Sequence, residues 1–113
     1  MTGAGGDGAI VLVVTLFIHP GRETEFRRFE TEAARIMRRH GGRIDRVIRP
    51  TGAASGASSP HEIHLVSFVS AAAFEAYRAD PELRALAPLR ESAISRTEVT
   101  TGVEGKPYGD GSP

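Results

Sequence analysis

Residues 9–18 read AIVLVVTLFI, and this run decides the fold. All but one of its side chains are apolar and many are β-branched, a pattern typical of a central β-strand covered on both faces. Pro20 and Gly21 then end the strand. We expect the even-numbered side chains of the run to face helices of the same chain, so that Val11, Val13, Thr15 and Phe17 face the other way.

The segment from Arg22 to His40 predicts an amphipathic helix. Its apolar side chains recur every three or four residues, so they form one stripe along a helix. Gly41 and Gly42 follow and should end the helix. The stripe consists of Phe26, Phe29, Ala33, Ile36, Met37 and His40.

Three further segments complete the pattern of strands. Residues 43–49 predict an exposed edge strand with Ile44 and Ile48 on one face. Residues 61–69 form a second strongly β-type run, and residues 95–103 alternate as a last strand.

Two shorter helices are expected between the last two strands. Ser70 is a suitable N-cap for a helix over residues 71–78. Asp80 and Pro81 then provide the cap and first residue of the next helix, which Pro88 should interrupt because proline removes an internal hydrogen bond.

The order β-α-β-β-α-β predicts an α+β ferredoxin-like sandwich over residues 9–103. We expect the first strand to lie next to and parallel to residues 61–69, and the last strand to neighbour the first. Two helices cover only one face of the sheet, so the apolar second face predicts an isologous homodimer. Residues 1–8 are expected to be a disordered segment and residues 104–113 a flexible tail.

Composition excludes several classes of protein. The chain of 113 residues has 14 basic and 14 acidic side chains and no cysteine. It therefore has no disulfide framework and no thiol nucleophile, and it lacks the basic excess of a nucleic-acid-binding protein. Its longest apolar run is about half of a membrane span, and no basic leader precedes it, so a cytoplasmic protein without membrane contact is expected. No phosphate-binding motif follows a strand, and no cofactor is expected.

His61 and His64 form an H-x-x-H motif on a predicted strand. Strand residues three apart point to opposite faces, so the motif does not predict a metal site. Glu62 does share a face with His64, and a histidine in an apolar interior can act as a general base because imidazole titrates near neutral pH. The alternative is a histidine that is hydrogen-bonded across the dimer and has no catalytic task.

The face of the sheet on which each side chain of this strand lies determines the rest of the predicted site. We expect Ile63, Leu65 and Val69 to face the helices, so that Glu62, His64, Val66 and Phe68 line the barrel interior.

Side chains from other elements are expected to complete the site. His19 ends the first strand on the face of Thr15 and Phe17, where it can approach the pocket or serve only as a turn residue. Glu98 is a candidate carboxylate on the last strand, with Arg46 as its partner across the dimer or with solvent around it. Two more candidates are Tyr77, whose hydroxyl can reach the cavity, and Arg90, which can reach an anionic ligand or remain solvated.

Three segments carry a resemblance to a known family: HPGRETEFRRFETEAARIMRRHGGRI, HEIHLVSFVSAAAFEAYRADPELRALAPLR and SRTEV. They resemble the dimeric α/β-barrel superfamily, and within it the group called domain of unknown function 1330. The pattern comprises a helix ending in His40–Arg43, the phrase Phe68–Ser70 and the helix junction Phe74–Pro81. The resemblance implies two sheets packed face to face in a homodimer. It also implies a pocket between the sheet and the helices of each subunit, or near the mouth of the half-barrel.

Members of this superfamily include cofactor-independent monooxygenases, polyketide cyclases, isomerases, haem-degrading enzymes and non-catalytic ligand binders. The resemblance therefore favours a cofactor-independent enzyme of secondary metabolism acting on a hydrophobic, carbonyl-bearing metabolite, with a non-catalytic or stress-related binding homodimer as the alternative. The predicted catalytic residues are His64, Glu62 and Glu98, and the predicted substrate-binding residues are Thr15, Phe17, His19, Arg46, Phe68 and Tyr77.

Overall fold

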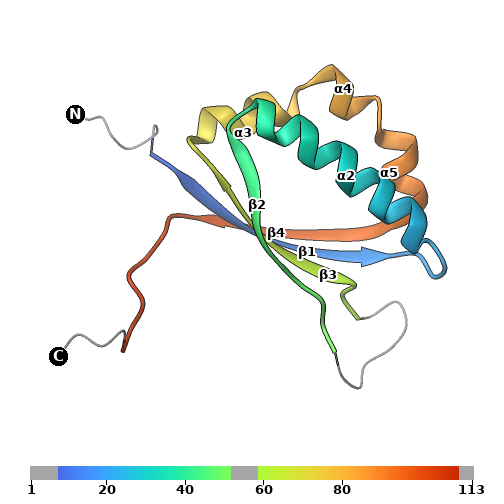
Figure 1. The fold of residues 1–113 in the computed structure, drawn as a ribbon, viewed down its shortest axis with the longest axis horizontal. Helices are drawn as coiled ribbons and strands as arrows, with labels where there is room; N and C mark the ends of the chain where they lie inside the picture. Colours follow the sequence, from blue (N-terminus) through green and yellow to red (C-terminus); the bar gives the residue numbers. More distant parts are fainter. Residues whose placement is uncertain (1–7, 52–58, 110–113) are drawn as a thin grey trace.

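A computed structural model describes residues 8–51 and 59–109. It contains one four-stranded sheet with all helices on one side (Figure 1). The expected strand–helix order is confirmed, with the second helical region divided into three short helices. The elements are β1 (Ile10–Ile18), α2 (Glu23–Arg39), β2 (Gly42–Ile48), β3 (Glu62–Phe68), α3 (Ala71–Arg78), α4 (Pro81–Arg84), α5 (Ala87–Ala93) and β4 (Ile94–Gly102).

The strands lie in the order β2-β3-β1-β4, and every neighbouring pair is antiparallel. The expectation that β1 runs parallel to β3 is therefore wrong, although the two strands are neighbours. The crossover through α2 makes β1 and β2 run in the same direction. The connection from β2 to β3 reverses the chain, so β3 runs against both of its neighbours.

Local sequence signals begin and interrupt the helices near the expected residues. The Ser70 hydroxyl accepts a hydrogen bond from the backbone N–H of Ala73 and caps α3. Asp80 caps α4 in the same way, through the backbone N–H of Glu82, and Pro81 occupies the first turn. The helical segment is interrupted between Arg84 and Ala87. Pro88 lies in the first turn of α5, where an N–H has no partner within the helix, so its absence has no cost.

A bulge changes the facing of strand β2. The register shifts between Ile44 and Arg46, so that Ile44 pairs with Val66 while Ile48 pairs with Ile63. Val66 and Ile63 are three residues apart on β3 and so point to opposite faces, and the prediction that Ile44 and Ile48 share a face is therefore wrong. The extra residue of the bulge accounts for the change of face.

The helices cover the face of β1 that the sequence predicts. Leu12 and Leu16 are buried between sheet and helices, at 2% and 3% exposed. Directly opposite residues of an antiparallel pair share a face, and Val14 pairs with His64. The expected facing of β3 is therefore reversed. The residues on its helix-covered side are Glu62, His64, Val66 and Phe68, and those on the other side include Ile63 and Leu65.

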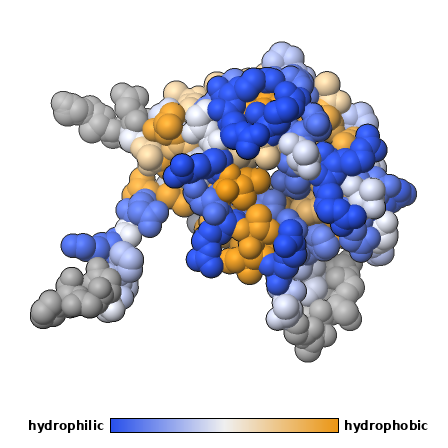
Figure 2. All heavy atoms as spheres, viewed as in Figure 1, coloured by the Kyte–Doolittle hydropathy of each residue, from blue (hydrophilic) through white to orange (hydrophobic). Residues whose placement is uncertain are grey.

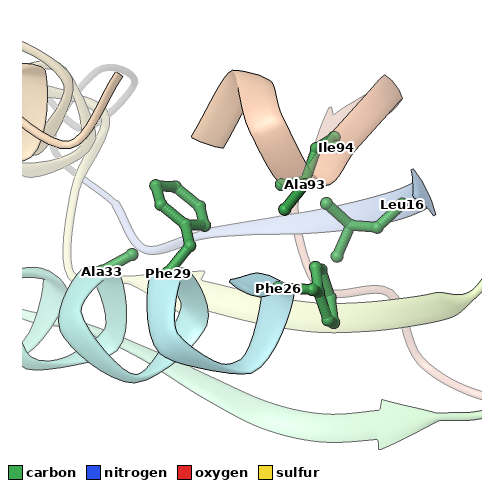
Figure 3. Packing of buried hydrophobic residues seen from close by; sticks show 6 residues of the cluster. All are labelled: Leu16, Phe26, Phe29, Ala33, Ala93 and Ile94. Carbon is green, nitrogen blue, oxygen red and sulfur yellow. The ribbon is translucent and has the colours of Figure 1, made fainter. Parts of the chain in front are cut away.

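The core fills the space between α2 and the sheet. Phe26 and Phe29 of α2 pack against Leu16 of β1 and against Ala93 and Ile94, where α5 meets β4 (Figure 3). A second cluster consists of Leu12, Met37, Val66 and Phe68. Figure 2 shows hydrophilic residues over the outer side of α2 and apolar residues gathered over the strands.

The ends of the chain are described only in part. The predicted disordered segment lies almost entirely outside the described residues, and so does the end of the predicted tail. Residues 103–109 are exposed and belong to no helix or strand. Among the described residues, no helix has both the length and the apolar character that a membrane crossing requires.

Candidate functional site

A cavity of about 380 Å³ lies between the sheet and the helices. Its walls are mainly apolar, with a few polar side chains that converge on it, which is the usual composition of a small-molecule site. The apolar part of the wall includes Leu12, Val14, Leu16, Phe29, Ala33, Met37, Val66, Phe68, Phe74, Leu83, Ile94 and Val99.

His64 is a buried polar side chain of this lining, at 4% exposed. Its Nε2 lies 2.7 Å from Oε1 of Glu62, which is also buried. The other oxygen of Glu62 accepts a hydrogen bond of 2.9 Å from Nε of Arg49, just beyond the end of β2. Glu62 and His64 lie two residues apart on β3, so the pleat itself brings them to the same face.

A third ionisable group faces His64 from the opposite wall. Oε1 of Glu30, on α2, lies 3.7 Å from Nδ1 of His64, and the Glu30 side chain is 20% exposed. Glu30 is not among the site residues predicted from the sequence. A signal was present, because Glu30 lies four residues after Phe26 and three before Ala33, so it interrupts the apolar stripe with a carboxyl group.

The two carboxyl groups have opposite pKa shifts. Burial and the nearby charge of Glu62 raise the pKa of Glu30 to about 7, although Arg90 acts against them. Burial acts to raise the pKa of Glu62 too, but hydrogen bonds from His64 and Arg49 outweigh it, and the pKa falls below its ordinary value. One carboxyl group is therefore held as an acceptor, while the other exchanges its proton near neutral pH.

These charges fix the proton on the imidazole. An ionised carboxylate can only accept, so Nε2 of His64 donates to Glu62 in the neutral imidazole. Its Nδ1 then carries the lone pair and lies on the side of Glu30, which lines the cavity together with His64. The arrangement resembles an oriented general base beside a general acid.

Aromatic side chains form one end of the cavity. The ring of Phe68 lies 5.2 Å from that of Phe74 and 5.5 Å from that of Tyr77, between ring centroids. Burial and the charge of Glu30 raise the pKa of Tyr77, so its phenol stays protonated and can donate a hydrogen bond. Of the predicted substrate-binding residues, Phe68 and Tyr77 thus lie in the cavity.

The other predicted site residues lie elsewhere. Thr15 pairs with Ile63 and Glu98, on the face of the sheet that the helices leave uncovered. Phe17 is on the same face beneath Arg96, whose guanidinium carbon lies 4.0 Å from the ring centroid. The remaining members are Arg46, which pairs with Leu65 across the strands, and His19, which is exposed beyond the end of β1.

The structure therefore separates the predicted site into two groups. Glu98 forms its ion pair with Arg96 at 3.2 Å, on the uncovered face, and Glu62 and His64 are on the covered face. Alternation along each strand correctly predicted which of its residues share a face. The prediction that Glu62 and His64 share one pocket with Thr15 and Glu98 was wrong, because Glu62 and His64 face the helices and the other two residues face away from them. Among the described residues, no group of three or more side chains is arranged to hold a metal ion.

The residues that carried the resemblance have structural roles around the cavity. Nε2 of His40, after α2, lies 2.7 Å from Oδ2 of Asp80 and so connects α2 to the start of α4. Gly41 has a φ of 73°. A Cβ on Gly42 would lie 2.3 Å from the ring of Phe68. Only glycine allows this ring to reach the cavity wall at its present position.

Comparison with known proteins agrees with this fold. The family model described as a domain of unknown function (DUF1330) matches residues 12–105. No curated protein matches the sequence.

Solved structures with the same fold have low sequence identity to this chain. A protein of unknown function from Rhodopseudomonas palustris has 15% identity, a TM-score of 0.75, and coverage of 89% of this chain and 85% of its own. A DABB family protein with a ferredoxin-like fold from Mesorhizobium loti has 20% identity, a TM-score of 0.64, and coverage of 88% and 99%. SnoaB, a cofactor-independent oxygenase from Streptomyces nogalater, has 14% identity, a TM-score of 0.68, and coverage of 91% and 99%.

Proposed function

Because this chain belongs to the DUF1330 family and has the ferredoxin-like fold of dimeric α/β-barrel proteins, we propose a function from its cavity. The protein binds a hydrophobic, carbonyl-bearing small molecule between sheet and helices and moves a proton on it without a cofactor. One observation carries this proposal: His64 lies between a carboxyl group with a lowered pKa and one with a raised pKa, inside an apolar cavity.

The chemistry follows from the geometry of these three groups. Nδ1 of His64 takes a proton from the carbon next to the carbonyl group, and the C–H electron pair becomes a carbon–carbon double bond. The carbonyl oxygen takes the proton of Glu30, so an enol forms, Glu30 is left as a carboxylate, and Glu62 stabilises the imidazolium. Return of the imidazolium proton to another carbon of a conjugated enol, with return of the hydroxyl proton to Glu30, completes an isomerisation. In a cyclisation the enol carbon attacks a second carbonyl carbon, the imidazolium protonates the new alkoxide, and the enol hydroxyl returns its proton to Glu30. In a monooxygenation, dioxygen as co-substrate adds at the enol carbon to give a hydroperoxide, which loses water and leaves a new carbonyl group.

Hydrogen–deuterium exchange tests the proton transfer directly. The probe is 2-tetralone, a bicyclic ketone small enough for the cavity, and its exchange in D₂O is followed by proton NMR. The wild-type protein should accelerate exchange beside the carbonyl group, and His64→Gln should reduce the acceleration by about a hundredfold or more. His61→Gln is the matched control, because His61 packs edge-on against Phe26 and does not line the cavity.

The alternative is a binding protein without catalysis. In that case 2-tetralone would bind, as seen in chemical-shift changes, but wild-type protein and His64→Gln would exchange its protons equally slowly. The Glu30→Gln variant refines the assignment: loss of acceleration at neutral pH with retained binding supports Glu30 as the acid.

The second half of the proposal concerns the uncovered face of the sheet. Val13, Ile63 and Leu65 lie there together, and Val13 is 38% exposed. We propose that a second copy covers this face, where Thr15, Phe17, Arg46 and Glu98 would meet the partner. Light scattering should give about twice the chain mass of 12.1 kDa. A mass equal to that of one chain would contradict the homodimer.

A further inference from the structure

The exposed part of the cavity lining is rich in arginine. Arg78 of α3, Arg84 of α4 and Arg90 of α5 all line the cavity and are all exposed. These helices follow one another above the sheet (Figure 1). Val99, on edge strand β4, is another exposed lining residue, at 52%. The cavity therefore opens between this helical segment and β4, through a rim that carries positive charge.

Two of the rim arginines form no ion pair within 4.0 Å of an acidic side chain among the described residues. Nη2 of Arg90 donates a hydrogen bond of 2.8 Å to the hydroxyl of Thr97, which is neutral. The Arg84 side chain has no hydrogen bond or ion pair within the described parts of the chain. By contrast, Arg78 pairs with Glu75 at 3.3 Å. A guanidinium has five N–H donors, so Arg84 and Arg90 keep donors for a ligand.

Two arginines of α2 beside the helix junction are paired instead. Arg35 and Arg39 of α2 both reach across to Glu82 at the helix junction, and Arg39 also reaches Asp80. Those charges are neutralised within the chain. At the rim, the positive charge of Arg90 affects the cavity lining, since it acts to lower the pKa of Glu30. The cavity thus has an apolar interior and a cationic entrance.

We propose that the ligand is an amphipathic organic anion, with a carboxylate held by Arg84 and Arg90 and an apolar body inside the cavity. Guanidinium groups bind carboxylates through paired hydrogen bonds, whereas an apolar wall gives no preference for charge. The inference rests on the proposed function, because it names the ligand class of the same cavity.

A matched pair of ligands tests the inference. Calorimetry on the full chain compares 2-naphthoate with 2-naphthamide, which have the same rings and differ mainly in charge. The wild-type protein should prefer the carboxylate by about tenfold, the factor that one charge-assisted hydrogen bond supplies. The double variant Arg84→Gln/Arg90→Gln should bind both ligands equally. Arg38→Gln is the control, since Arg38 is exposed on α2 and is not part of the lining of this cavity.

Each outcome has a distinct meaning. Equal binding of both ligands by the wild-type protein overturns the anion inference and leaves small-molecule binding intact. A preference that survives in the double variant also overturns it, because the carboxylate would be bound elsewhere. Binding of neither ligand overturns both the inference and the proposed function. His64→Gln should keep the preference for naphthoate, which separates recognition at the rim from proton transfer inside.

Discussion

The two faces of the sheet are built from the same strands but differ in what they bury. The helix-covered face holds Glu62 and His64 at 6% and 4% exposed, beside a cavity. The uncovered face has apolar side chains such as Val13 at 38% exposed, and its ionisable groups, Arg46 and Glu98, are exposed. An ionisable pair is thus buried on the covered face, whereas on the uncovered face Val13 is partly exposed and Phe17 is buried only beneath the side chain of Arg96.

This contrast indicates different roles for the faces. Burying two ionisable groups costs free energy unless they are hydrogen-bonded, so a buried pair of which one member, His64, lines a cavity is a candidate for function. Apolar groups left at the surface point to association instead. The covered face is therefore the proposed reaction site, and the uncovered face is the proposed contact with a second copy.

The largest expected effect comes from truncating the same residue type on each face. Leu12→Ala removes a side chain that is 2% exposed on the covered face, and we expect a loss of about 3–4 kcal/mol in the free energy of unfolding. Leu65→Ala on the neighbouring strand and the opposite face should cost about 1 kcal/mol in a dilute monomer. Urea denaturation measures both.

Protein concentration sharpens this first comparison. If a second copy covers Leu65, the cost of Leu65→Ala should grow with concentration while that of Leu12→Ala stays constant. Equal costs for the two variants in dilute solution would contradict the difference between the faces.

The next effect concerns the pH dependence of the covered face. The pKa of Glu30 is raised from 4.5 to about 7, so the native state binds its proton more tightly than the unfolded chain. The stabilisation is complete below pH 4.5 and is lost as the pH rises through 7. Glu30→Gln should therefore gain about 3 kcal/mol relative to wild type between pH 4 and pH 8.

Thermal or urea unfolding at several pH values measures this difference. An identical pH dependence in wild type and Glu30→Gln would mean that Glu30 titrates normally, and Glu30 would then lose its assigned role as acid.

A smaller effect is expected from a charge on the uncovered face. Val13→Glu places a carboxylate where the second copy would pack, and the dimer dissociation constant should rise by about a hundredfold. Val47→Glu is the matched control. Val47 is 42% exposed, similar to Val13, but pairs with His64 and so lies on the other face. Sedimentation equilibrium measures the dimer dissociation constant of both variants, and equal constants would contradict the proposed interface.

The sequence predicted the elements well because each depends on local signals. The stripe of α2, the Ser70 and Asp80 caps and the break near Pro88 all act within one or two turns. The facing of β3 depends on register instead. Ile63 and Leu65 are as apolar as Val66 and Phe68, so alternation separates two faces without indicating which one the helices cover.

The candidate site was predicted in part for the same reason. Glu62 and His64 were found because two residues on one strand must share a face. Glu30 lies on a different element, and only the packing of α2 against β3 brings it to 3.7 Å from His64. The sequence showed it as an irregularity in an apolar stripe. The bulge that separates Ile44 from Ile48 had no comparable signal, since any residue of β2 could have been the extra one.

The smallest expected effect is at Arg49, which follows the end of β2 and donates a hydrogen bond to Glu62. Arg49 is highly exposed, so Arg49→Gln should change the free energy of unfolding at pH 7 by less than about 1 kcal/mol. The pKa of Glu62 should nevertheless rise, because one of its hydrogen bonds from a cation is lost. A lowered carboxyl pKa stabilises the fold above pH 4.5, and this stabilisation is lost as the pH falls through the lowered value. The destabilisation by Arg49→Gln should therefore be larger at pH 7 than at pH 3. Carbon-13 NMR of the Glu62 carboxyl group measures the pKa directly, and an unchanged value would show that His64 alone holds Glu62 ionised.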